Sequence, residues 1–395
     1  MRYGRSWGRL GMISEWSVKR MYEIANINPR ESLKKGTTAK KVPMDQLIPF
    51  CRDIPIYQEA IYEGGSKFRN GDTIMARITP CLENGKIAKV NILNENEIGF
   101  GSTEYIVFRA KDNVNEDYLY YLVCSSIVRD PAIQSMVGSS GRQRVQIDVL
   151  QNLEILVPSK KEQNKIGSIL KAIDDKIDIN TKINRNLQEQ VQAFFSRLYC
   201  NATDQSKYKS LIKVLGGGTP KTGVESYWNG TIPFFTPKDV GFPYTFETEK
   251  NITEDGLAHC NSKLYPANTT FVTARGTVGK VALAGVPMAM NQSCYALISD
   301  ILPPLMIYFY TLEVVKALKH KANGAVFDAI VTKDFDTEII NVLEQEDQIV
   351  FLDFAEPAYK QIYENIVENQ RLQTLRNSLL PKLMTGQLDI SEIEI

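Results

Sequence analysis

Residues 158–199 read PSKKEQNKIGSILKAIDDKIDINTKINRNLQEQVQAFFSRLY, a pattern that predicts one long helix. The chain returns 185 positions later to LEQEDQIVFLDFAEPAYKQIYENIVENQRLQTLRNSLLPKLM, residues 343–384, which aligns with the first stretch without a gap. In both copies the seam residues recur at alternating intervals of four and three, as in a coiled coil. The repeat predicts two helices, each about 60 Å long, that pair with each other.

Both predicted seams contain two asparagines at matching positions. The central seam residues are Ile173, Ile177, Asn180, Asn184 and Leu187 in the first helix and Ile362, Asn365, Asn369 and Leu372 in the second. A buried polar residue in a seam lowers stability but fixes the register, because one alignment alone lets the amides satisfy each other. A large segment separates the two helices in sequence, so we expect them to run antiparallel with their asparagines meeting near the middle.

The composition is that of a folded protein with more than one domain. The chain has 395 residues, of which 43% are apolar and 23% charged, and this length accommodates two or three domains with proper cores. No apolar run is long enough to span a membrane, and the first residues lack the apolar centre of a signal peptide. We therefore expect a cytoplasmic protein without a membrane partner.

The charges and the metal-binding residue types exclude several functions. Lysines and arginines number 46, as do aspartates and glutamates, so strong nonspecific binding to nucleic acid by this chain alone is not expected. Six cysteines occur without a CxxC pair, and the chain has two histidines. This pattern predicts no structural metal site and, in a reducing compartment, no disulfide.

The long helices divide the chain into alternating globular and helical parts. Short alternating strands, a few helices and turns rich in glycine and proline predict a mixed α/β fold for each globular part. The predicted segments are a nonperiodic extension at 1–11, a globular domain at 12–157, a helix at 158–200, a second globular domain at 201–342, a second helix at 343–385 and a tail at 386–395.

The internal repeat extends into the globular domains. GDTIMAR at 71–77 aligns with TTFVTAR at 269–275, and each strand is followed by a Gly-Lys pair, Gly85-Lys86 and Gly279-Lys280. Outside this common frame the loops of the two domains differ almost completely. One scaffold with two different sets of loops is what binding to two different targets requires.

Arg77 and Arg275 end the matching strands and are candidate contacts to nucleic acid. Arginine can bond bidentately to guanine or to a phosphate, and the end of a strand leads into a surface loop. An internal salt bridge that holds the repeated fold explains the pair equally well, because residues that read different targets should differ between the domains.

The remaining candidates for DNA contacts lie in predicted loops. They are Lys34, Lys35, Lys40, Arg142, Gln143 and Arg144 in the first domain and Lys221, Thr236 and Lys238 in the second. Lysine and threonine interleaved in a loop suit phosphate contacts, although a solvated loop has the same composition. Tyr227 and Trp228 have faces on which bases could stack, but a core position is the better interpretation of an isolated pair.

No catalytic arrangement emerges from the sequence. The run GGGTPKT at 216–222 suggests a phosphate-binding loop, but Pro220 stands before the lysine where that loop needs glycine and a backbone donor. With two histidines and no nucleophile paired with a base, we expect a noncatalytic chain.

The sequence resembles the specificity subunit, or S polypeptide, of type I restriction-modification systems. Three runs of residues carry the resemblance: GGTPKT…YWNGTIPFFTPKD at 217–239, LEILVPSKKEQNKI at 153–166 and SLLPKLMTGQL at 378–388. The second helix departs from the family pattern at its start, with Leu343 in place of proline. The resemblance covers the chain from Met12 onward and implies two target-recognition domains separated by spacer helices.

The resemblance also implies a function and partners. Each globular domain would read one half of a split sequence in double-stranded DNA, with the half-sites about one helical turn apart. Two methyltransferase subunits would dock on the helices and methylate adenine with S-adenosylmethionine, and two motor-nuclease restriction subunits would use ATP and Mg²⁺. This chain would bind none of these cofactors. Two alternatives remain: a coiled-coil scaffold whose globular ends bind other proteins and, with less support, a nuclease or NTPase.

Overall fold

The structure is a computed structural model that describes residues 16–321 and 329–390. The chain divides into two compact units: unit 1 runs to Asn180 and resumes at Glu368, and unit 2 is Thr181–Val367. Both units combine helices with mixed sheets, so the predicted α/β class is confirmed. The predicted extension at 1–11 and the end of the predicted tail lie outside the described residues. Within the described ranges no helix is long and apolar enough to cross a membrane.

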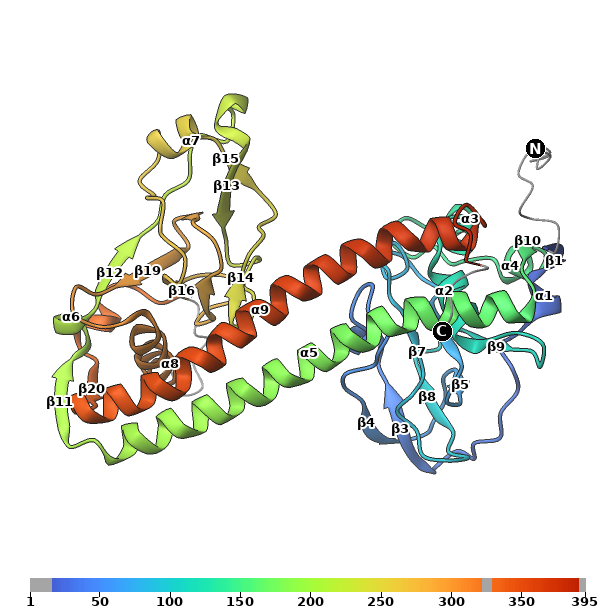
Figure 1. Cartoon of the computed structure of the whole chain (residues 1–395), viewed down its shortest axis with the longest axis horizontal. Coiled ribbons are helices and arrows are strands. Elements are labelled where there is room, and N and C mark those ends of the chain that lie inside the picture. Colours follow the sequence, from blue (N-terminus) through green and yellow to red (C-terminus); the bar gives the residue numbers. More distant parts are fainter. Residues whose placement is uncertain (1–15, 322–328, 391–395) are drawn as a thin grey trace. The chain divides into compact units, whose positions relative to one another are not determined.

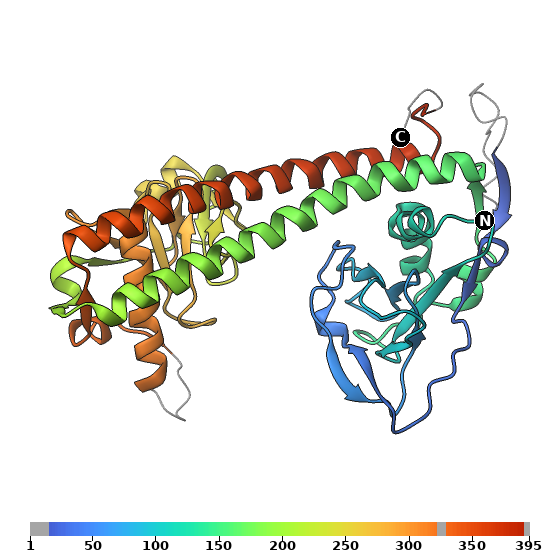
Figure 2. The same ribbon diagram turned by 60° about the horizontal axis from the view of Figure 1, so that its bottom comes forward.

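The two long helices are α5 (Lys160–Asn201) and α9 (Gln345–Met384). They run side by side in each unit, drawn in green and red in Figures 1 and 2. Within each unit, residues farther along α5 contact residues nearer the start of α9. The two helices are therefore antiparallel. All the predicted seam residues are buried or half-buried.

The seam asparagines pair with each other across the two helices. In unit 1, Asn180 Nδ2 donates to Asn369 Oδ1 at 2.9 Å and to Glu368 Oε2 at 2.7 Å. In unit 2, Asn365 Nδ2 donates to Asn184 Oδ1 at 2.7 Å. Each pair joins an asparagine of α5 to one of α9, as the antiparallel pairing requires. Sliding either helix would leave buried amides without partners.

The start of α5 explains the sequence of its junction. Ser159 Oγ and backbone N both donate to the Glu162 carboxylate, while Glu162 N donates to Ser159 Oγ at 3.4 Å, which is a capping box. Gln163 is buried, and its Nε2 donates to Pro158 O at 2.9 Å. Its Oε1 accepts from Asn115 N at 3.0 Å, which ties the globular part to the helix start.

The second junction keeps the same glutamine contact despite its different sequence. Gln348 Nε2 donates to Leu343 O at 2.8 Å, as Gln163 does to Pro158 in the first copy. At its other end α9 terminates on Gly386, whose φ of +69° lies in the left-handed region. Gln387 N then donates to Lys382 O at 2.9 Å, a Schellman closure that accounts for the TGQL sequence.

Unit 1 contains two four-stranded sheets of orders β2-β9-β6-β7 and β4-β3-β8-β5, and the pair β1-β10. Its strands are β1 (Ser17–Arg20), β2 (Ala25–Ile27), β3 (Thr38–Val42), β4 (Gln58–Ile61), β5 (Lys67–Phe68), β6 (Thr73–Ala76), β7 (Ile87–Lys89), β8 (Gly99–Gly101), β9 (Tyr105–Ala110) and β10 (Glu154–Val157). Its other helices are α1 (Met21–Ile24), η1 (Met44–Gln46), α2 (Glu116–Cys124), α3 (Ser126–Gln134) and α4 (Ile147–Gln151).

Unit 2 contains a five-stranded sheet of order β12-β19-β16-β17-β14, a three-stranded sheet of order β15-β13-β18, and the pair β11-β20. Its strands are β11 (Asp204–Lys207), β12 (Lys213–Gly216), β13 (Trp228–Phe235), β14 (Tyr244–Thr245), β15 (Asn251–Ile252), β16 (Thr270–Thr273), β17 (Val281–Ala284), β18 (Ala289–Met290), β19 (Cys294–Ile298) and β20 (Ile339–Val342). Its other helices are α6 (Tyr208–Leu211), η2 (Glu225–Tyr227), α7 (Glu254–Ala258), α8 (Pro304–Lys321) and η3 (Asp334–Asp336).

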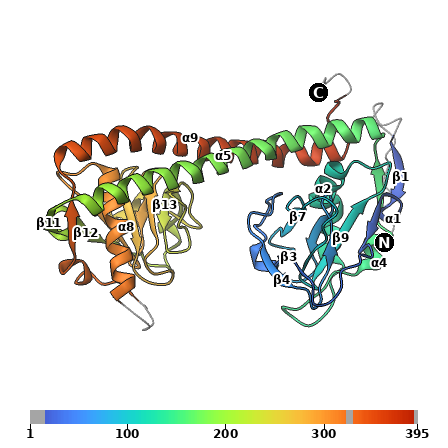
Figure 3. The same ribbon diagram turned by 90° about the horizontal axis from the view of Figure 1, so that it is seen from below.

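The two units share a common frame. The order β2-β9-β6-β7 in unit 1 matches β12-β19-β16-β17 in unit 2, and β1-β10 matches β11-β20. In each unit an aromatic helix, α2 or α8, packs between the sheet and the long helices, as Figure 3 shows. The frame is therefore repeated, and each core includes the halves of α5 and α9 that belong to its unit.

The asparagine pair of unit 2 gives a test of the register. Replacing Asn184 by leucine leaves Asn365 Nδ2 without its acceptor, and we expect a loss of about 1–3 kcal/mol in the free energy of unfolding. The double variant Asn184→Leu/Asn365→Leu should recover wild-type stability or exceed it, because apolar seam residues are tolerated. Urea denaturation followed by circular dichroism measures both. Asn186→Leu, on the exposed face of α5, is the control, and a double variant no more stable than the single one would contradict the pairing.

Candidate nucleic-acid interface

Lys34, Lys35 and Arg142 of unit 1 occupy exposed loops. Lys34 and Lys35 lie in the turn before β3, and Arg142 follows the glycine-bounded turn at 138–141. Gly138 and Gly141 have φ values of +136° and +76°, which permit this tight turn. Within the described residues none of the three cationic groups has a carboxylate within ion-pair distance. They remain candidates for phosphate contacts.

Lys40 does not fit the predicted contact to DNA. Its side chain lies inside unit 1, where Nζ donates to Ile92 O at 2.9 Å and pairs with Glu97 Oε2 at 3.1 Å. Lys40 is 8% exposed, because β3 turns it inward while the lysines of the preceding turn face solvent. The prediction for Lys40 is therefore corrected: the side chain serves an internal ion pair.

Three further candidates of unit 1 surround the start of α4. Arg144 binds Glu104 bidentately at 2.7 and 3.0 Å, and Arg77 Nε donates to Val145 O at 3.2 Å. Gln143 is half-buried, and its carbonyl accepts from Thr79 N at 3.1 Å. Arg77 and Arg144 thus hold the 138–145 segment against the sheet, which places Arg142 at the surface. For Arg77 and Arg144 the geometry favours the internal role over DNA contact.

The glycine-rich run of unit 2 packs against neighbouring backbone. A Cβ on Gly217 would lie 2.1 Å from Asn291 O, and one on Gly218 would lie 2.6 Å from Asn261 N, so both positions require glycine. Lys221 follows with an exposed side chain, and its carbonyl accepts from Trp228 Nε1 at 3.2 Å. The Trp228 ring contacts Phe234 edge-on at 5.6 Å between centroids. The run and the tryptophan together fix the loop that presents Lys221.

Thr236, Lys238 and Arg275 lie on two loops that touch. Thr277 Oγ1, in the loop of Arg275, donates to Pro237 O at 3.0 Å, in the loop of Lys238. Lys238 and Arg275 are exposed. Thr236 bonds the Asp239 carboxylate through its backbone N at 2.8 Å and its hydroxyl at 2.6 Å, so its hydroxyl shapes the turn. The fold thus joins two candidates that lie far apart in sequence and gives Thr236 an internal role.

Arg77 and Arg275, which match in the repeat, have different surroundings. Arg77 is half-buried and bonded to backbone, whereas Arg275 is exposed in the turn after β16. The internal role therefore fits Arg77, whereas the exposed position of Arg275 fits a contact to DNA.

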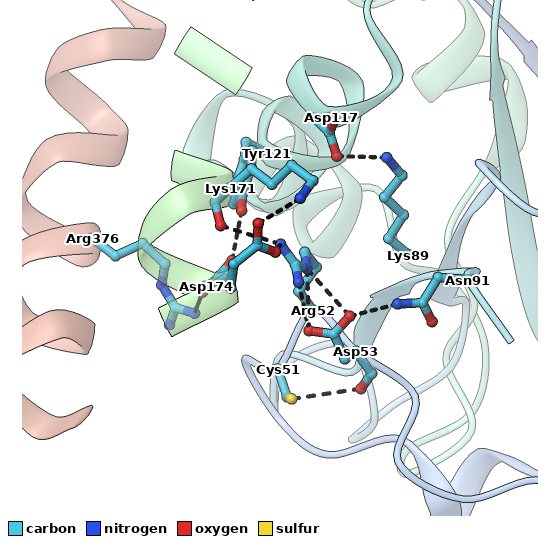
Figure 4. Close-up of polar contacts among 11 residues, drawn as sticks. Cys51, Arg52, Asp53, Lys89, Asn91, Asp117, Tyr121, Lys171, Asp174 and Arg376 are labelled. Atoms are coloured by element: carbon cyan, nitrogen blue, oxygen red, sulfur yellow. Dashed lines mark hydrogen bonds and ion pairs between the residues drawn. The ribbon is translucent and has the colours of Figure 1, made fainter. Parts of the chain in front are cut away.

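A buried polar cluster fixes the globular part of unit 1 to the helices, as Figure 4 shows. The Asp174 carboxylate of α5 accepts from Arg376 Nη1 of α9 and from the Tyr121 hydroxyl of α2, each at 2.7 Å. Beside it Arg52 bonds Asp175 Oδ1 at 2.8 Å and Lys171 O at 3.3 Å. Asp174 is 4% exposed, so the cluster joins three elements out of water.

The charges of this cluster support one another. Burial works against the positive charge of Arg376, but the Asp174 carboxylate outweighs it and raises the pKa of the guanidinium. Burial and the negative charge of Asp174 raise the pKa of Tyr121, which keeps its hydroxyl a donor. Sequence analysis missed this cluster, although Arg376 follows the seam residue Leu372 by four positions, and an arginine at such a position signals a buried partner on the facing helix.

Comparison with known proteins assigns the family. A family model described as the type I restriction modification DNA specificity domain matches twice, over residues 13–189 and 203–374. The chain belongs to this family. The matches cover most of the sequence, one in each half, and agree with the repeated strand order. The resemblance found in the sequence is confirmed, and with it the function of a DNA specificity subunit.

Individual relatives agree with this assignment. The chain is 29% identical over 189 residues to the specificity subunit of the type I restriction enzyme MjaIX of Methanocaldococcus jannaschii, covering 46% of this chain and 41% of that one. It is 21% identical over 407 residues to the HindI specificity subunit of Haemophilus influenzae, covering 81% of this chain and 87% of that one.

A solved structure has a similar fold. The crystal structure of the type I restriction-modification system S subunit from M. genitalium superimposes with a TM-score of 0.60 at 12% identity. The superposition covers 95% of this chain and 97% of that one.

Removing one member of the buried ion pair tests the cluster. Arg376→Met leaves the Asp174 charge buried with the Tyr121 hydroxyl as its remaining partner, and we expect a loss of about 3–5 kcal/mol in the free energy of unfolding. Adding Asp174→Asn should recover part of the lost stability, because a neutral amide needs no cation as a partner. Urea denaturation provides the measurement. Arg371→Met, exposed on the same helix, is the matched control, and equal effects of the two arginine variants would refute the cluster's contribution.

Proposed function

We propose that the chain is the noncatalytic specificity subunit of a type I restriction-modification complex and that each unit binds one half of a split sequence in double-stranded DNA. The double match to the DNA specificity domain carries this proposal. The two units support it by combining one strand order with different loops. A chain that read one continuous sequence would have no need of two differently equipped copies of a scaffold.

The chemistry of methylation and cleavage belongs to partner subunits in this proposal. Methyltransferase subunits bind S-adenosylmethionine and transfer its methyl group to an adenine in each half-site. Motor-nuclease subunits use ATP and Mg²⁺. The chain itself binds none of these cofactors and acts in the cytoplasm, where the DNA is. Its contribution is to choose the sequence and to position its partners.

The exposed faces of the long helices offer the surface for methyltransferase docking. In unit 2, Ile349, Val350 and Phe354 of α9 are 53%, 53% and 41% exposed. Phe354 contacts Phe194 of α5 edge-on at 5.4 Å between centroids, and both line a hollow of about 530 Å³. In unit 1, Ile179 and Leu375 are 51% and 45% exposed. Apolar side chains gathered on a helix surface are typical of a protein interface.

The genome-wide pattern of methylated adenines tests the proposal. The chain would be produced with a methyltransferase subunit of a type I system in a host without adenine methylation, and the methylated positions would be mapped by sequencing. We expect a single motif of two defined half-sites separated by a spacer of fixed length. The same host without this chain is the control. A complex that assembles but methylates no defined motif would refute the proposal, and binding to other proteins without DNA would favour the scaffold alternative.

Exchange of one globular domain tests the division between half-sites. We expect that replacing residues 201–342 by the equivalent segment of a relative changes one half of the methylated motif and leaves the other half unchanged. The physical reason is that each unit has its own core and its own loops. The matched exchange of residues 12–157 should change the opposite half. A change in both halves after either exchange would be incompatible with independent units.

Lengthening one helix tests whether the helices set the spacer. Four residues inserted after Asn184 add about one turn, or 6 Å, to α5. We expect the motif to keep both half-sites and gain spacer length, or methylation to be lost because the seam residues of α5 beyond Asn184 no longer align with α9. The control is a chain of unchanged length in which four residues on the exposed face of α5 are substituted. Full activity with an unchanged spacer would show that the helices do not determine the distance.

A further inference from the structure

A basic groove of about 780 Å³ lies on unit 2 between two loops and the end of α8. Its walls come from residues 237–242 after β13, from residues 277–281 between β16 and β17, and from the last turns of α8. Five of its lining residues are basic: Lys238, Lys280, Lys316, Lys319 and His320. None of the described residues that line the groove is acidic.

The turn at Gly279 brings two of these lysines together. Gly279 has a φ of +70°, and its carbonyl accepts from Lys319 Nζ at 2.6 Å. A Cβ at this position would lie 2.5 Å from Lys319 Cε, so glycine leaves room for the lysine side chain to cross the turn. Burial and the charge of the neighbouring Lys280 lower the pKa of Lys319. Uncompensated positive charge is thus concentrated here, and a bound anion would relieve the repulsion.

The acidic groups nearby compensate little of this charge. Lys238 lies 3.5 Å from Glu249, and Lys316 lies 3.8 Å from Glu313, both at the long end of ion-pair distances. Among the described residues, Lys280 and Lys319 have no carboxylate within ion-pair distance. Exposed pairs of this length contribute little to stability. The lysines are therefore available to an external anion.

Phe242 stands at the rim of the groove and is 73% exposed, the highest value among the large apolar side chains of the described residues. The preceding Gly241 is packed tightly, because a Cβ there would lie 2.0 Å from Tyr244 O. The turn thus holds the phenyl ring outward. An aromatic ring beside cationic groups matches the alternating apolar and charged surfaces of a nucleic acid strand.

The corresponding turn of unit 1 borders a smaller hollow of about 260 Å³ with a different lining, which includes Phe50, Arg129 and Asp174. Gly85 has a φ of +74°, but the Phe50 ring covers it, since a Cβ on Gly85 would lie 2.5 Å from that ring. The Arg129 guanidinium lies over the Phe50 ring, 5.3 Å from its centroid. The repeated frame therefore forms a basic groove in unit 2 and, in unit 1, a smaller hollow whose lining contains the carboxylate of Asp174.

We propose that this groove binds the phosphodiester backbone of DNA at the half-site of unit 2, with Lys280, Lys316 and Lys319 facing phosphates and Phe242 packing on an adjacent sugar or base edge. This inference rests on the proposed function and assigns residues that the sequence pattern did not indicate. The loops of Lys238 and Arg275 touch at this site, so residues suited to phosphate and to base contact adjoin each other.

The salt dependence of DNA binding distinguishes the two kinds of contact. The complex of the full chain with its methyltransferase subunits would be titrated with a duplex containing the mapped motif between 50 and 200 mM salt. We expect the double variant Lys280→Gln/Lys316→Gln to reduce the slope of log affinity against log salt by about 2, since each phosphate contact contributes about 0.9. We expect Phe242→Ala to weaken binding about tenfold at every salt concentration without changing the slope.

Lys213→Gln is the matched control, because this exposed lysine lies on β12 at the opposite edge of the five-stranded sheet from β14. For this variant, the slope of log affinity against log salt should equal that of the unaltered complex. Groove variants that keep the original affinity and slope would overturn the groove assignment while leaving the proposed function intact. Groove variants that lose the methyltransferase subunits but keep DNA affinity would place a protein there and also overturn it. An unaltered complex that binds no specific duplex would overturn both proposals.

Discussion

The antiparallel pairing of α5 and α9 is the constraint on which both units depend. The core of unit 1 includes Ile166 and Leu170 of α5 with Leu383 of α9, and the core of unit 2 includes Val191 of α5 with Phe351 of α9. Neither globular part is complete without these helix surfaces, which is why the compact units divide the helices near the middle and not at their ends. The apolar seam supplies stability, and the asparagine pairs specify one alignment.

The same frame is fastened by different chemistry in the two units. Asp174 and Arg376 correspond in the helix repeat to Tyr359 and Val191. Where unit 1 has its buried ion pair, unit 2 has Tyr359 against Tyr308 and Phe309, at 5.8 and 5.6 Å between ring centroids. Removing one partner of the ion pair leaves a buried charge, whereas removing one ring leaves a cavity. The repeat thus conserves the position of the contact between globular part and helix, while its chemistry differs.

The distribution of polar side chains suits a chain that selects DNA and leaves catalysis to others. Three of the predicted DNA contacts of unit 1, Arg77, Arg144 and Lys40, are held in contacts within the chain. The other cations among the predicted DNA contacts are exposed and lie on loops: Lys34, Lys35, Arg142, Lys221, Lys238 and Arg275. A balanced net charge with localised basic surfaces limits nonspecific binding and leaves specificity to particular contacts.

The sequence by itself determined the two helices, their seams, the repeated frame, the mixed α/β class and the family. These features rest on periodicity and on local motifs, which short stretches of chain express without knowledge of their neighbours. The tertiary structure alone decided which basic residues face solvent. Lys40 is buried because Ile92 and Glu97 come to it from another part of unit 1, and Lys319 borders a groove because its partner carbonyl belongs to Gly279, 40 residues away. Exposure and charge at a site depend on segments that meet only when the chain has folded.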